Sequence, residues 1–111
     1  MIIAIDYDDT YTADPRGWDA VIAYMSDRGH EFICVTGREE TQPADINLPI
    51  IYAPSSYKKK AAEKAGYSVD VWIDDLPGFI EEGRVIEWRE NDIQVLPNDR
   101  NNAPPSGGRV D

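Results

Sequence analysis

The chain has 111 residues, a length that fits one domain. Its formal net charge of −10 repels nucleic-acid phosphates, which argues against sequence-independent binding to long DNA or RNA. Cys34 is the single cysteine and lies within an apolar run, so we expect a buried structural thiol and no internal disulfide. The chain opens directly into an apolar strand without a signal peptide, and no apolar stretch approaches the roughly 18 residues of a membrane span. We therefore expect a cytoplasmic protein.

The first ten residues contain an apolar run, Ile2 to Ile5, which predicts a buried strand. The run ends in three carboxylates, Asp6, Asp8 and Asp9, and ligands of open α/β sheets bind just beyond such strand ends. Three carboxylates this close repel one another, and a divalent cation is the simplest way to offset that repulsion. A solvated acidic turn is the alternative interpretation.

The next two predicted elements are a helix and a strand. Asp14-Pro15 has the composition of a helix N-terminus, and Gly29 suits the position just after its last turn. Between them, apolar residues recur at helical spacing and predict one apolar face, formed by Trp18, Val21, Ile22 and Met25. A second strand is predicted over 31–35, ending in Thr36-Gly37.

A weaker third strand is predicted over 48–53, with Pro49 near its start or on an edge. A helix over 57–65 should follow it, capped by Ser55 or Ser56 and ended by Gly66.

The last elements are a fourth strand over 67–73, which ends in Asp74-Asp75, and a short helix over 76–82. Further strands are predicted over 84–88 and 93–96. The polar segment 97–111, rich in Pro and Gly, is expected to be a disordered tail to a core domain spanning 1–96.

Strands that alternate with helices predict an α/β fold with a parallel sheet, in which the carboxyl ends of all strands lie on the same edge. That edge would collect carboxylates, a hydroxyl group, backbone N–H groups and an ammonium group. All four lysines lie between Lys58 and Lys64, which suggests a local site for a specific anion in an acidic protein. Together these groups could hold a phosphoryl group beside a metal ion.

Four motifs in this order resemble the haloacid dehalogenase-like (HAD-like) hydrolase superfamily. The first is a strand followed by Asp-x-Asp-x-Thr, here Asp6 to Thr10, and the second is a strand that ends in Thr36-Gly37. The third is a lysine at a helix start, within 58–60, and the fourth is a strand that ends in paired acids, Asp74-Asp75. The match covers residues 1 to about 82 and implies a Rossmannoid three-layer α/β/α fold with a central parallel sheet.

The resemblance implies a role for each matching residue. Asp6 would be the nucleophile that forms an aspartyl-phosphate, and Asp8 would be the general acid/base. Thr36 and the Gly37 N–H would bind the phosphoryl group with Lys58, although Lys59 is an alternative for the motif-three lysine. Four residues would hold Mg²⁺: Asp6, Asp8, Asp74 and Asp75. Asp8 would contribute its main-chain carbonyl. One of Asp74 and Asp75 would bind the ion directly and the other would act through water or a neighbouring ligand, and the sequence leaves open which.

Other residues near the motifs keep two interpretations each. Asp9 falls at a variable position and is expected to be solvated or to support the site indirectly, and Thr10 is expected to shape the turn. Arg38 would reach the phosphate or remain solvated. The tyrosines near the motifs could stack on a base or sugar, or serve packing: Tyr7, Tyr11 and Tyr57.

Many family members insert a cap domain between motifs one and two or between motifs two and three. Here these motifs are separated by only 26 and 22 positions, which leaves no room for a folded cap. The site should therefore be open to a phosphorylated small molecule or to the phosphorylated end of a larger one. An exposed edge strand or Trp88 is compatible with a homodimer, and no membrane partner is expected.

The favoured function is a Mg²⁺-dependent phosphatase that hydrolyses a phosphate monoester through Asp6. The alternative is a non-catalytic phosphate- or metal-binding module on the same fold. A signalling receiver domain fits poorly, because receivers place a lone phospho-acceptor at strand three, where this chain has Ala53-Pro54.

Overall fold

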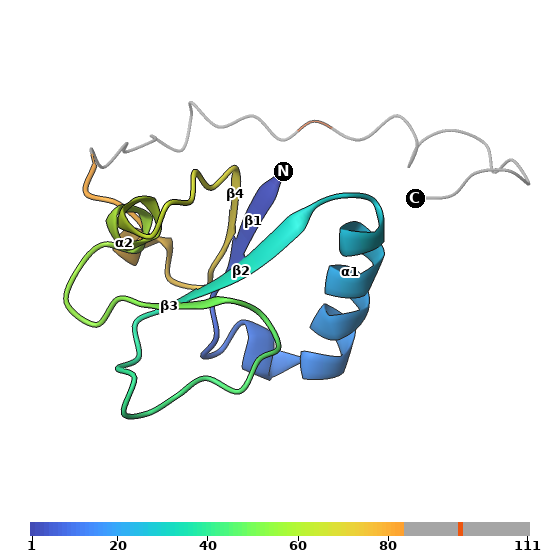
Figure 1. The fold of residues 1–111 in the computed structure, drawn as a ribbon, viewed down its shortest axis with the longest axis horizontal. Coiled ribbons are helices and arrows are strands. Elements are labelled where there is room, and N and C mark those ends of the chain that lie inside the picture. Colours follow the sequence, from blue (N-terminus) through green and yellow to red (C-terminus); the bar gives the residue numbers. More distant parts are fainter. Residues whose placement is uncertain (84–95, 97–111) are drawn as a thin grey trace, which may run out of the picture.

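A computed structural model describes residues 1–83 and 96 of the chain. Its centre is a sheet of four parallel strands in the order β3-β2-β1-β4 (Figure 1). The strands are β1 (Ile2–Ile5), β2 (Glu31–Thr36), β3 (Ile50–Tyr52) and β4 (Val71–Ile73). The prediction of an α/β fold with a parallel sheet is confirmed.

The register of the sheet aligns the strand ends that carry the predicted motifs. Ile5, the last residue of β1, pairs with Cys34 of β2 and with Ile73 of β4. The ladder continues one step further, because the Asp6 N–H donates to the Ile73 carbonyl at 2.9 Å. The chain therefore brings the ends of β1 and β4 side by side, and their acidic residues with them.

Helix α1 (Pro15–Asp27) begins and ends where the sequence predicts. Asp14 caps it by accepting the Gly17 N–H at 3.0 Å, and a Cβ at position 17 would collide with the capping carboxylate. Gly29 follows the helix with φ of 92°, a left-handed conformation that glycine adopts at little cost.

The two helices lie on opposite sides of the sheet (Figure 1). On the side of α2 (Lys58–Lys64), a fully buried cluster joins Ala4, Ile33 and Val35 of the strands to Ala62 of the helix. Helix α1 contains no fully buried residue, and its predicted apolar face is only half-buried, with Val21 43% exposed. The buried cluster that includes a helix residue therefore lies between the sheet and α2.

The predicted serine cap of α2 is wrong. Tyr57 occupies the N-cap position with an extended backbone, and no side chain caps the helix. One of the free N–H groups of the first turn, that of Lys59, instead donates to the Ile80 carbonyl at 2.8 Å. The predicted helix over 57–65 agrees with α2 to within one residue at each end, and only its cap differs, because a tertiary contact satisfies the N–H group that a local side chain was expected to bind.

Three predicted elements are shorter than expected. β3 begins after Pro49, and β4 comprises three residues in place of the predicted 67–73. Among residues 1–83, β4 lies at one end of the sheet and its residues pair only with Ile3 to Ile5, while Tyr67 and Val69 pack against the core without joining the ladder. The predicted helix over 76–82 is a single 3₁₀ turn, η2 (Pro77–Phe79).

Between β1 and β2 the chain forms only α1 and a 3₁₀ turn, η1 (Tyr11–Ala13), and between β2 and β3 it forms no helix or strand. The connections thus contain no folded cap. The strands predicted over 84–88 and 93–96 and the tail 97–111, with the domain boundary at 96, lie outside the described residues apart from Leu96. No helix in the described part is long and apolar enough to cross a membrane.

Candidate functional site

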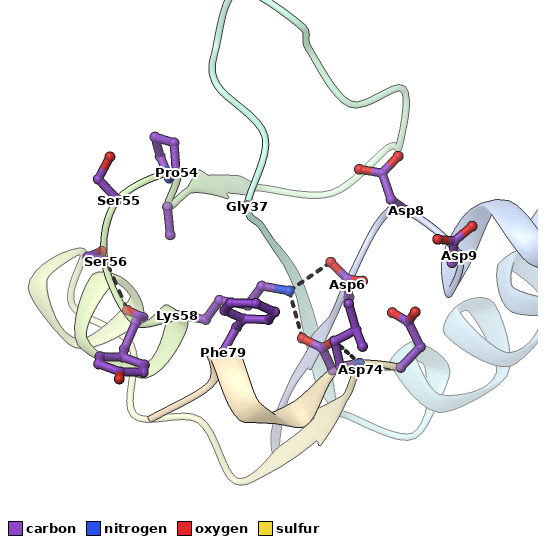
Figure 2. Close-up of a pocket in the computed structure, with 14 residues that line it drawn as sticks. Asp6, Asp8, Asp9, Gly37, Pro54, Ser55, Ser56, Lys58, Asp74 and Phe79 are labelled. Carbon is purple, nitrogen blue, oxygen red and sulfur yellow. Dashed lines mark hydrogen bonds and ion pairs between the residues drawn. The ribbon is translucent and has the colours of Figure 1, made fainter. Parts of the chain in front are cut away.

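The site is centred on the buried ammonium group of Lys58, at the start of α2. Its Nζ lies 2.8 Å from Asp6 Oδ1 and 2.7 Å from Asp74 Oδ2 (Figure 2). The side chains of Lys58, Asp6 and Asp74 are only 8%, 8% and 2% exposed. Charges this well buried are stable only when they are paired, so the three groups depend on one another.

Burial and pairing act in opposite directions on the protonation of these groups. Burial raises the pKa of Asp6, and the hydrogen bond and charge of Lys58 offset only part of that effect. For Lys58, burial alone would lower the pKa, but hydrogen bonds to Asp6 and Asp74 outweigh it and raise the pKa. The lysine therefore remains a cation at neutral pH.

Thr10 ties the loop after β1 to the loop after β4. Its hydroxyl lies 3.0 Å from Asp75 Oδ1 and 3.4 Å from Asp6 Oδ2, and it accepts the Asp75 N–H at 3.2 Å. The single hydroxyl proton is best placed for the shorter contact, to Asp75. The Thr10 hydroxyl therefore positions Asp75, and the expectation that Thr10 shapes its own turn stays a prediction.

Three carboxylates meet at this point and could hold a metal ion. Oxygen atoms of Asp6, Asp74 and Asp75 lie within 4.8 Å of one another. Carboxylate oxygens are the ligands that hard divalent cations prefer. With Lys58 as the neighbouring cation, three ionised carboxylates leave an excess of two negative charges, which a divalent cation would balance. The residues therefore fit such an ion.

The side chain of Asp8 is not brought into this cluster. It forms a two-pronged ion pair with Arg38, with 2.9 Å from Nε to Oδ2 and 2.9 Å from Nη2 to Oδ1. Figure 2 shows Asp8 directed away from Asp6 and Lys58. The Arg38 hydrogen bonds hold the pKa of Asp8 below its usual range. The Asp8 side chain is still 49% exposed, so it has room to rotate.

Arg38 has a side chain that is 33% exposed, and its guanidinium is engaged by groups of the chain itself. The two roles considered from the sequence, phosphate binding and solvation, stay predictions. Besides pairing with Asp8, Arg38 donates from Nη1 to the Gln42 and Pro43 carbonyls at 3.2 and 3.4 Å. Its guanidinium also lies over the Tyr7 ring, 4.9 Å from the centroid. Sequence reasoning missed the Arg38–Asp8 pair, and the adjacency of β1 and β2 is the only signal that could have suggested it.

The two residues of motif two are placed differently. Thr36 is fully buried, its hydroxyl accepts the Arg38 N–H at 3.2 Å, and it does not line the pocket described below. Gly37 does line that pocket and is exposed. The structure therefore brings Gly37 and Lys58 to one pocket and leaves Thr36 beneath its surface.

The remaining residues near the motifs divide between packing and the site. Tyr11 is buried and donates to Asp19 at 2.7 Å, which raises the pKa of its hydroxyl to about 12, and its ring stacks on Tyr7. Tyr57 is 39% exposed and lines the pocket. Asp9 is exposed and has φ of 61°, a left-handed conformation that aspartate tolerates better than most residues.

An open pocket of about 560 Å³ lies over this edge of the sheet (Figure 2). Its polar side holds the carboxylates of the cluster with Lys58 and Gly37, and also Asp8 and Asp9. Its other side is formed by the segment after β3 and by η2. The site predicted at the carboxyl edge of the sheet thus coincides with a cavity of ligand size.

Searches against protein-family models, curated proteins and solved structures gave no match for this chain. Relatives therefore assign no role to these residues. What the site can do follows from its own chemistry: a buried lysine between two carboxylates, a third carboxylate within reach of the same ion, and a pocket above them.

Proposed function

We propose that this protein is a Mg²⁺-dependent phosphatase of the HAD-like type, which hydrolyses a phosphate monoester through an aspartyl-phosphate on Asp6. The observation that carries the proposal is the Lys58 ammonium held between Asp6 and Asp74 beneath an open pocket. A permanent buried cation beside a carboxylate nucleophile attracts the phosphoryl group and lowers the repulsion between two anions.

The proposed reaction has two steps. In the first, an Asp6 carboxylate oxygen attacks phosphorus and the bond from phosphorus to the ester oxygen breaks. Asp8, a carboxylate while it pairs with Arg38, would take a proton from solvent once it is released and donate that proton to the leaving oxygen. In the second, Asp8, now a carboxylate, takes a proton from water, and that water attacks the phosphorus of the aspartyl-phosphate. The bond from phosphorus to the Asp6 oxygen breaks and inorganic phosphate leaves. Asp6 is a carboxylate again, and Asp8 is protonated for the next cycle.

Asp8 must separate from Arg38 to play this part. The pair is half-exposed, and the guanidinium can bind a phosphoryl oxygen as well as a carboxylate. A substrate phosphoryl group that engages Arg38 would release Asp8 and free it to accept a proton. Gly37 lines the same pocket, and its N–H would add a backbone donor, while Thr36 would support the loop from below.

The metal ligands in this proposal are Asp6, Asp74 and Asp75, with the Asp8 main-chain carbonyl as a further candidate. A bound Mg²⁺ would neutralise charge on the transferring phosphoryl group. Asp75 is held by Thr10 and Asp74 by Lys58 and the Leu76 N–H, so both acids are oriented by hydrogen bonds from the chain itself.

Phosphate release from a mixed panel of monoesters tests the proposal. The wild-type protein is expected to turn over at least one ester in Mg²⁺ and none in EDTA. Because unaided monoester hydrolysis is extremely slow, Asp6→Asn should abolish turnover. Borohydride reduction of protein quenched during turnover should convert Asp6 to homoserine. A residual rate near wild type in Asp6→Asn would exclude Asp6 as nucleophile. Asp27→Asn removes an exposed carboxylate of α1 that does not line the pocket and controls for the change in charge.

A non-catalytic phosphate- or metal-binding module is the second candidate. The Arg38–Asp8 ion pair favours it, because Asp8, the proposed general acid/base, is bound to Arg38 and directed away from Asp6. Calorimetric binding of Mg²⁺ and phosphate with no turnover on the same panel would support this role. Turnover that disappears in Asp6→Asn would exclude it.

A further inference from the structure

The pocket has an apolar half that the proposed chemistry does not use. Three of its side chains are unusually exposed for their type: Phe79 is 61% exposed, Leu76 57% and Tyr57 39%. Ala53 and Pro54 complete this wall. Figure 2 shows Phe79 and Pro54 at the same pocket as Lys58 and Asp6. Apolar surface is therefore presented directly beside the position proposed for the phosphoryl group.

The segment that carries Leu76 and Phe79 is anchored to the site. The Leu76 N–H donates to Asp74 Oδ1 at 2.9 Å, at the end of β4. Beyond η2, the Ile80 carbonyl accepts the Lys59 N–H at 2.8 Å, and Lys59 Nζ pairs with Glu81 at 3.0 Å. These bonds fix η2 to both β4 and α2. Its apolar side chains are thus held at the pocket while remaining accessible to a ligand.

We propose, on the basis of the phosphatase function above, that the substrate is a small phosphate monoester whose leaving group carries a flat, uncharged ring. The phosphoryl group would lie at Lys58, and the ring would lie against Phe79 and Leu76. Stacking on an exposed aromatic side chain and burial of the two apolar side chains would supply the binding energy. Nucleoside monophosphates and arylmethyl phosphates share this chemistry.

Charge and size oppose other substrate classes. Within the described part of the chain, Lys58 is the only cation that lines the pocket, and it is already paired with two carboxylates. Asp8 and Asp9 line the polar side, so a second phosphate group would meet negative charge. A sugar phosphate without a ring system of this kind would leave Phe79 and Leu76 uncovered. The volume of about 560 Å³ suits a small molecule.

Matched substrate pairs test the inference without changing the reacting bond. Adenosine 5′-monophosphate and ribose 5-phosphate both release a primary alcohol and differ in the base. Benzyl phosphate and cyclohexylmethyl phosphate differ in the flatness of the ring. We expect kcat/KM to be about tenfold higher for the nucleotide than for the sugar phosphate, and about threefold higher for benzyl than for cyclohexylmethyl phosphate. A preference confined to benzyl phosphate would support an arylmethyl ester as the source of the ring.

Phe79→Ala should lower the preference for the nucleotide over ribose 5-phosphate about tenfold, chiefly through a higher KM. Because Phe79 is 61% exposed, its removal is not expected to unfold the protein. Tyr24→Ala, which removes a 65% exposed aromatic ring from α1, should leave the preference unchanged. Equal kcat/KM values within each pair would overturn the inference and leave the phosphatase proposal intact. Absence of wild-type turnover on every ester would overturn both.

Discussion

Replacement of Lys58 by methionine should destabilise the protein by about 3 kcal/mol at neutral pH in EDTA. The variant keeps most of the side-chain volume but removes the cation between two carboxylates that are at most 8% exposed. Removal of one partner of a buried ion pair typically costs about 3–5 kcal/mol, because the remaining charge is buried without compensation. The lower end applies here, since the pair borders an open pocket that water can enter.

The same reasoning fixes how the loss depends on pH. Without Lys58, burial should raise the pKa of Asp6 further, so the folded state would bind a proton more tightly than the unfolded state. A raised carboxyl pKa contributes stability at low pH and loses it as the pH rises through the folded value. The deficit of Lys58→Met should therefore shrink as the pH falls from about 7 to about 5.

Urea unfolding followed by circular dichroism measures these quantities. Saturating Mg²⁺ should reduce the deficit of Lys58→Met, because the carboxylates without Lys58 have one more uncompensated negative charge and should bind the cation more tightly than those of the wild type. Lys59→Met is the matched control: its pair with Glu81 is 46% and 60% exposed, and its loss should matter far less. A deficit in EDTA below about 1 kcal/mol, or one that grows as the pH falls, would refute the role given to the buried ion pair.

Three further predictions concern the surroundings of the site. Asp14→Ala should destabilise the protein by about 1 kcal/mol in urea unfolding, because the Gly17 N–H loses its cap, and Asp14→Asn should retain most of the stability. Arg38→Ala should raise the pKa of Asp8 toward its ordinary value in a carbon-13 NMR titration; an unchanged value would contradict the ion pair. Since Arg38 holds that pKa below its usual range, the pair should stabilise the fold above about pH 4 and cease to do so as the pH falls through the depressed value. Burial raises the pKa of the Cys34 thiol to about 12, so a thiol reagent near neutral pH should label it only after unfolding, and fast labelling of the native protein would show that the core opens.

Sequence reasoning located the elements that depend on local patterns. An aliphatic run predicted β1, and the Asp14-Pro15 start and Gly29 end gave α1, because caps and breakers act within a few residues of themselves. It overestimated β4, which within the described residues has β1 as its one neighbour and forms only the three pairs that β1 offers. It also assigned the cap of α2 to a serine, whereas the Ile80 carbonyl, which is distant in the sequence, accepts the Lys59 N–H of the first turn.

The sequence by itself determined which chemical groups gather at one edge of the sheet, because parallel strands place all their carboxyl ends on the same side. The meeting of Asp6, Lys58 and Asp74 could be anticipated in this way. Only the tertiary structure decided that Arg38 forms an ion pair with Asp8 and that Phe79 is exposed and lines the pocket. Such pairings depend on side-chain directions and on contacts between distant segments, and the periodicity of strands and helices predicts neither.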